Sequence, residues 1–90
     1  MMRSPDAETL ALKGLAFLAR EPETLLRLLT LTGLELDDLK ARAGDSELLA
    51  AVVDFLLADD ALLTRFAQDE ALDVKEVHAA RRALPGAPEI

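Results

Sequence analysis

Three aspartates near the middle of the chain have the residue type and spacing that could bind a hard metal ion. Asp59 and Asp60 are adjacent, and Asp54 lies shortly before them in the sequence. Carboxylate oxygens are the ligands that Mg²⁺ and Ca²⁺ prefer, so this group could form the centre of a metal-dependent enzyme. The chain lacks the residue spacing of an EF-hand, however, and aspartate at a helix start ordinarily caps the helix. We therefore expect no metal ion and no catalytic role at these residues.

Asp54 also interrupts an apolar stretch, because ten of the eleven residues from 48 to 58 are apolar. A carboxylate buried there without a partner would cost several kcal/mol of folding free energy. We expect Asp54 either to occupy the solvent-facing position of its helix or to pair with a basic side chain such as Lys13 or Arg65. The functional alternative is a direct contact between Asp54 and a binding partner.

Towards its carboxyl end the chain carries a basic cluster made of Lys75, His78, Arg81 and Arg82. This cluster could meet an acidic protein or a phosphate group, and within a helix-turn-helix it could contact nucleic acid. Cations near the carboxyl end of a helix are also favoured by the helix dipole alone. The net charge of −7 and the lack of a helix dense in Lys and Arg argue against nucleic acid. His78 has no nucleophile motif to serve, so we expect no catalysis.

Composition indicates one small domain, with 90 residues, no Cys and a hydrophobic fraction of 51%. No disulfide can form, and no glycine-rich loop or dinucleotide fingerprint suggests a cofactor. The longest apolar run, residues 48–53, is too short to span a membrane, and the amino terminus lacks the apolar stretch of a signal peptide. We expect a cytoplasmic protein without membrane contact. The apolar fraction exceeds the need of so small a core, which favours an additional interface.

Cap residues, prolines and glycines divide the chain into short helices, and no strand pattern is present. Pro22 and Gly33 bound one helix, while Asp45, Asp59 and Asp73 each stand where an N-cap is expected. The expected helices cover residues 5–20, 22–32, 36–43, 45–58, 59–70 and 73–84, and residues 86–90 are expected to fray. The fold class is therefore all-α, a compact bundle of five to six short helices. The helices at 5–20 and 45–58 carry most of the apolar surplus, for which we expect a tightly packed core; the functional alternative is a homodimer seam or a groove for a partner.

The two halves of the chain align when the sequence is shifted by 38 residues. Seven aligned pairs are identical, with first members Leu10, Phe17, Leu18, Leu25, Arg27, Leu34 and Ala41. Helix entries coincide as well, since Glu21 aligns with Asp59 and Glu35 with Asp73. We interpret residues 7–44 and 45–82 as two copies of a three-helix unit within the single domain 1–90. If they share one core, the first helix packs against the fourth.

The halves also differ at a few positions that are candidates for function. Asp54 stands where the first half has Ala16. Arg81 and Arg82 stand where it has Ala43 and Gly44. If a simple helical unit was duplicated and then specialised, these departures are where a functional site is expected.

Segments spread over most of the chain carry a family resemblance. Residues 54–62 read Asp-Phe-Leu-Leu-Ala-Asp-Asp-Ala-Leu, and they are followed by Phe66 and by Arg-Ala-Leu-Pro-Gly at 82–86. Together with residues 6–19 and 32–39, these segments resemble a family of short bacterial proteins classified as domain of unknown function 3572. Residues 87–90 depart from the tryptophan-containing tail of that family. The resemblance implies a small helical bacterial protein, and it supplies no activity and no catalytic residue.

These observations favour a non-enzymatic helical interaction module that acts through an apolar patch rimmed by acidic residues. Its partner would be another protein or a second copy of the chain, which would make a homodimer. The residues singled out for interaction are Asp54, Asp59, Asp60, His78, Arg81 and Arg82. The alternative is a small nucleic-acid-associated regulator that uses the basic face of the last helix.

Overall fold

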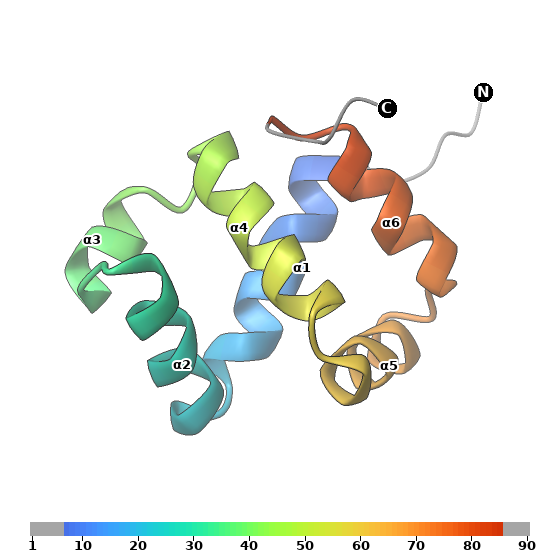
Figure 1. Ribbon diagram of the computed structural model, residues 1–90, viewed down its shortest axis with the longest axis horizontal. Coiled ribbons are helices and arrows are strands. Elements are labelled where there is room, and N and C mark those ends of the chain that lie inside the picture. The colour runs from blue at the N-terminus through green and yellow to red at the C-terminus, as the bar shows by residue number, and fades with distance from the viewer. Residues whose placement is uncertain (1–6, 86–90) are drawn as a thin grey trace.

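The computed structural model describes residues 7–85, and every regular element in this part of the chain is an α-helix (Figure 1). The helices are α1 (Ala7–Ala19), α2 (Pro22–Thr32), α3 (Leu36–Ala41), α4 (Ser46–Leu57), α5 (Asp60–Asp69) and α6 (Val74–Arg82). The all-α fold class and the helical bundle are thereby confirmed. The expected helix start at residue 5 and the expected fraying of 86–90 lie outside the described residues.

Three aspartates cap helices where the sequence predicted caps. The Asp45 carboxylate accepts a hydrogen bond from the backbone N–H of Glu47 at 2.9 Å. Asp59 accepts hydrogen bonds from two backbone N–H groups in the first turn of α5, at 3.1 and 3.2 Å. Asp73 and Glu76 form a reciprocal capping box at the start of α6. Each bond satisfies a backbone donor that the helix itself leaves unpaired.

Helices α2 and α3 lack side-chain caps. Glu21 and Glu35 occupy the N-cap positions of α2 and α3, but neither side chain makes a capping hydrogen bond. Glutamate is not among the short polar residues that reach the backbone N–H groups well from this position. Helix α3 ends at Ala41, before the expected residue 43. Gly33 ends α2 as predicted, in the left-handed conformation with φ of 75°.

An ion pair between Arg42 and Asp45 stabilises the turn between α3 and α4. The Arg42 guanidinium donates a hydrogen bond to the Asp45 carboxylate at 3.1 Å. The backbone N–H of Glu47 and then the Arg42 side chain hold the pKa of the Asp45 carboxyl below its usual value, because both favour the ionised form. The carboxylate therefore remains ionised as the cap of α4 in mildly acidic solution.

Helices α1 and α4 cross at the centre of the molecule, with α2 and α3 to one side and α5 and α6 to the other (Figure 1). Their approach is close at Gly14, where an added Cβ atom would lie 2.9 Å from Cδ1 of Leu56 and 3.5 Å from Cγ1 of Val52. Packing, rather than backbone conformation, therefore favours a glycine here, because a larger residue would require the Leu56 side chain to shift. The predicted contact between the first and fourth helices is present.

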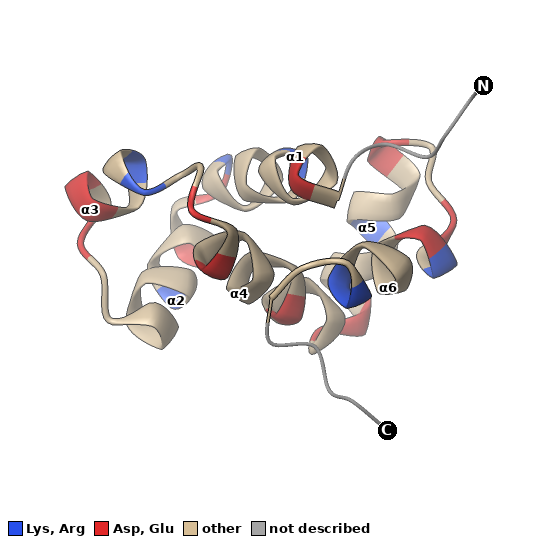
Figure 2. Ribbon diagram, turned by 90° about the horizontal axis from the view of Figure 1, so that it is seen from above, with Lys and Arg blue, Asp and Glu red and all other residues tan. Residues whose placement is uncertain are grey.

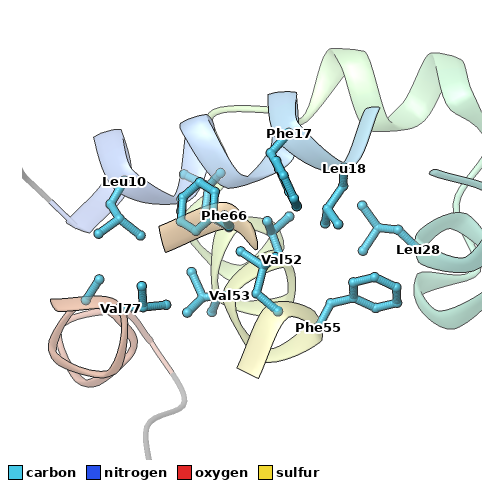
Figure 3. Close-up of a cluster of buried hydrophobic side chains, with 14 of the residues drawn as sticks. Leu10, Phe17, Leu18, Leu28, Val52, Val53, Phe55, Phe66 and Val77 are labelled. Carbon is cyan, nitrogen blue, oxygen red and sulfur yellow. The ribbon is translucent and has the colours of Figure 1, made fainter. Parts of the chain in front are cut away.

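Hydrophobic side chains from the surrounding helices close over this crossing (Figure 3). Fully buried side chains come from five helices, namely Leu10, Leu18, Leu28, Leu49, Val52, Val53, Leu56, Phe66 and Val77. The two sides of the crossing are covered unequally. Helix α6 packs against both α1 and α4 and buries Val77 and Ala80, whereas Leu39 is the one buried side chain of α3.

Replacement of Gly14 by Val should destabilise the protein by about 1–3 kcal/mol, because the added side chain would force the fully buried Leu56 side chain to move. Urea denaturation followed by circular dichroism measures the change. Ala16→Val on the exposed side of α1 is the matched control and should cost about 0.5 kcal/mol through helix propensity alone. Equal losses for the two variants would contradict the close approach at Gly14.

Candidate functional site

The departures Asp54 and Arg81, which the sequence singled out separately, meet in one contact. Nε of Arg81 donates a hydrogen bond to Oδ1 of Asp54 at 2.6 Å. Nη1 of Arg81 also donates to the backbone carbonyls of Leu84 and Pro85, at 3.4 and 3.0 Å. The Arg81 side chain is 13% exposed and that of Asp54 is 55% exposed. We call this contact the α4–α6 clasp, since it fixes the end of α6 on α4.

The clasp corrects the expected partner of Asp54. The carboxylate faces solvent as predicted, but its basic partner is neither Lys13 nor Arg65. Lys13 lies 3.8 Å from Glu70, and Arg65 lies 2.9 Å from the carboxylate of Glu21. The physical reason is that α6 packs along α4 on the side that carries Asp54, so that Arg81 reaches it first.

The clasp also changes the basic face of α6. Arg81 turns inward to Asp54, so it is not part of a free basic surface. Lys75, His78 and Arg82 remain as exposed basic residues of α6, near its two ends and its middle. Figure 2 shows basic segments towards both ends of this helix, with acidic segments close by. The surface expected for a phosphate or nucleic-acid contact is thus smaller than the sequence suggested.

Asp59 and Asp60 lie at the start of α5 and stabilise it. Asp59 is its N-cap, and its second carboxylate oxygen lies 3.5 Å from Nη2 of Arg27. Asp60 is exposed in the first turn, where a negative charge is favoured by the helix dipole. Within residues 7–85, no three His, Cys, Asp or Glu side chains come together in an arrangement that could hold a metal ion. The two aspartates and Asp54 therefore do not form one site.

Two arginines at equivalent positions of the sequence repeat make reciprocal contacts between the halves. Arg65 of α5 lies over the ring of Phe17 in α1, with 5.7 Å from its guanidinium carbon to the ring centroid. Arg27 of α2 lies over the ring of Phe55 in α4, at 5.3 Å. Phe17 and Phe55 are 38 residues apart, as are the two arginines. This exchange is what a duplicated unit with a shared core would produce, although the duplication itself stays a prediction.

The two arginines differ in how fully their acidic partners engage them. Nη2 of Arg65 donates a hydrogen bond to the Glu21 carboxylate at 2.9 Å. Nη2 of Arg27 lies 3.5 Å from Asp59, whose other carboxylate oxygen is engaged in capping α5. The Glu21 carboxylate makes no capping hydrogen bond, so it is available to accept a hydrogen bond from Arg65. The guanidinium of Arg27 is therefore less fully bonded than its counterpart.

A shallow hollow of about 420 Å³ lies beside Arg27, between α2 and α4. We call its lining the α2 leucine face, which consists of Leu26, Arg27, Thr30 and Leu31 of α2 together with Phe55 of α4. Leu26 and Leu31 are each 64% exposed, more than any other large hydrophobic side chain among residues 7–85. Exposed apolar patches are a common feature of interaction surfaces, so this face is the candidate site.

The other half of the chain provides an internal comparison for this face. A shift of 38 residues places Thr64, Gln68 and Asp69 of α5 at the positions of Leu26, Thr30 and Leu31. All three are exposed, so at equivalent outward positions α5 carries ordinary solvent-facing polar residues. The leucines of α2 are therefore a departure from the repeat that solvent exposure does not explain.

The apolar residues of the helices expected at 5–20 and 45–58 lie mostly in the packed core, as predicted. Helix α4 buries its apolar residues almost completely, and α1 exposes Leu12 at 42%. The most exposed leucines belong to α2, because α1 and α4 are covered by their neighbours while the outer side of α2 is not. The signal was present in the sequence as the mismatch between the leucines of α2 and the polar residues aligned with them in α5.

A family model described as "Protein of unknown function (DUF3572)" matches residues 4–87 of the chain. The chain belongs to this family. The resemblance seen in the sequence is thereby confirmed over nearly the whole length. No curated protein and no solved structure matches the chain. Among residues 7–85 of this family member, no helix has both the length and the apolar character needed to cross a membrane.

The α4–α6 clasp leads to a prediction about stability. In a double-mutant cycle, Asp54→Ala and Arg81→Ala should show a coupling energy of about 0.5–1.5 kcal/mol in urea denaturation, as expected for a partly exposed charged hydrogen bond. Arg82→Ala, at the exposed neighbouring position, should change the free energy of unfolding by less than about 0.5 kcal/mol. Strict additivity of the two clasp variants would show that the contact does not hold α6.

Proposed function

We propose that this protein is a non-enzymatic helical protein-interaction module whose contact surface is the α2 leucine face. The observation that carries the proposal is the exposure of Leu26 and Leu31 at positions where the other half of the chain has Thr64 and Asp69. Two equivalent helix surfaces in one molecule therefore differ in apolar character. That difference is expected when one of the two surfaces is covered in use.

Energetics support a partner on this face. Full burial of a leucine side chain contributes about 1.5–3 kcal/mol, so covering two leucines that are 64% exposed would contribute roughly 2–4 kcal/mol. Aromatic and arginine side chains are the residues that most often carry binding energy at interfaces, and Phe55 and Arg27 lie together beside the leucines. The hollow thus combines apolar side chains with the polar side chain of Arg27, which can set the orientation of a bound partner.

The shape of the surface favours a helix as the binding element. The hollow runs between α2 and α4 and is lined along α2 from Leu26 to Leu31, which is a little more than one helical turn. Amphipathic helices commonly dock into such grooves through apolar anchors spaced by three, four or seven residues. A bound small molecule would ordinarily be enclosed on most sides, whereas here both leucines project into solvent.

The side chains that first suggested chemistry support a non-enzymatic role. Asp54 and Arg81 bind one another, and Asp59 caps α5 while facing Arg27. These groups contribute to the fold in ways that account for their presence. The candidate interaction surface therefore lies on α2, away from most of the residues that the sequence singled out.

The proposal predicts that a neutral probe helix will bind at α2. The probe is an alanine- and glutamine-based helical peptide with leucines at positions i, i+4 and i+7, titrated into the ¹⁵N-labelled full chain. Backbone amide shifts should change at Leu26, Thr30, Leu31 and Phe55 and saturate together. The double variant Leu26→Thr/Leu31→Asp, which introduces the residues found at the aligned α5 positions, should abolish these changes. It should lower the free energy of unfolding by about 1–2 kcal/mol through helix propensity and the acid in the last turn of α2, and circular dichroism should show that the chain stays folded.

The matched control is Thr64→Ala/Gln68→Ala on α5, which alters the equivalent surface without touching α2. This control should bind the probe as the unaltered protein does. Shift changes that are absent, or that scatter over the whole molecule and persist in the leucine double variant, would overturn the proposed function.

A further inference from the structure

We infer that the α2 leucine face accepts an amphipathic helix of another protein that presents an Asp or Glu carboxylate to Arg27 between its apolar anchors. This inference rests on the proposed function and adds the chemistry of the partner. Two differences between the halves of the chain meet at this place. One is the pair of exposed leucines, and the other is the incomplete bonding of Arg27.

The Arg27 guanidinium has N–H donors that are available to a binding partner. A guanidinium carries five N–H donors, and the equivalent Arg65 uses Nη2 in a 2.9 Å hydrogen bond to Glu21. Arg27 approaches Asp59 at 3.5 Å, and among the described residues its side chain forms no hydrogen bond that meets ordinary distance and angle limits. The reason is local, because Asp59 caps α5 with the carboxylate oxygen that accepts from Ala61 and Leu62.

The surroundings of Arg27 favour a hydrogen bond from these donors to a carboxylate of a partner. The Arg27 guanidinium lies 5.3 Å from the centroid of the Phe55 ring, and Arg27 itself lines the apolar hollow. Its side chain is 53% exposed, so a ligand can reach it. When a partner helix covers the leucines, water is excluded and a carboxylate–guanidinium hydrogen bond strengthens. A partner without a carboxylate would bury the guanidinium with the ion pair to Asp59, at 3.5 Å, as its acidic contact among the described residues.

A second copy of the chain does not supply this carboxylate. On α2 the side chains between the two leucines that line the hollow are Arg27 and Thr30, so a copy docked through the same face would bring arginine towards arginine. Each copy would also add a net charge of −7. Both effects oppose pairing of this face with itself. The electrostatics of the hollow therefore favour a different protein whose helix is apolar with an acid at its centre.

The test compares three probe helices that differ at one residue between the leucines, which is Gln, Glu or Lys. Each is titrated into the ¹⁵N-labelled full chain at low ionic strength, and dissociation constants are taken from the shifts of α2 amides. The Glu peptide should bind about three-fold more tightly than the Gln peptide, and the Lys peptide more weakly than both. Arg27→Gln should remove the preference for Glu. Arg65→Gln, the equivalent change in the other half, should keep it.

The outcomes separate this inference from the proposed function. Equal binding of all three peptides, or a preference for Lys, would overturn the inference and leave an α2 interaction surface in place. A preference for the Glu peptide that remains in Arg27→Gln would also overturn the inference, because a group other than Arg27 would then bind the carboxylate. If no peptide binds and the α2 amides broaden with protein concentration, a second copy covers the face and the inference is wrong. If no peptide binds and the protein stays monomeric, both the inference and the proposed function fail.

Discussion

The close approach of α1 and α4 at Gly14 is the constraint on which the rest of the fold depends. Because the two central helices cross without a side chain of residue 14 between them, each half of the chain reaches the end of the other half's long helix. Arg65 can then lie over Phe17, and Arg27 over Phe55. The core is therefore shared, and neither set of three helices has a separate hydrophobic interior. Small changes at the crossing would propagate to both arginine contacts.

Features that depend on neighbouring residues could be predicted from the sequence. Asp45, Asp59 and Asp73 cap helices through backbone groups two or three residues away, and Gly33 ends a helix through its own backbone conformation. The partner of Asp54 could not be predicted in this way, because it lies 27 residues away on another helix. Periodicity shows which face of a helix is apolar, but it does not give the angle at which α6 packs on α4.

The two halves differ from one another in two ways. In the second half, Asp54 and Arg81 stand where the first half has alanines, and their hydrogen bond joins α6 to α4. In the first half, α3 is short and buries one side chain, and α2 keeps two exposed leucines. A leucine stripe at helical spacing ordinarily belongs to a core, so α2 gave no sign of an interface by itself. Comparison with α5 identifies the outward leucines, and the structure shows that they remain uncovered.

We propose that the outward residues of α2, and not its position in the fold, make it a binding surface. Exchange of those residues between the halves tests this directly, with Leu26→Thr and Leu31→Asp on α2 and Thr64→Leu and Asp69→Leu on α5 in one chain of unchanged net charge. The measurement is the footprint of the neutral probe helix on backbone amide shifts. We expect the footprint to move from α2 to α5, where Arg65 lies over Phe17 as Arg27 lies over Phe55. A footprint that stays on α2 would contradict it.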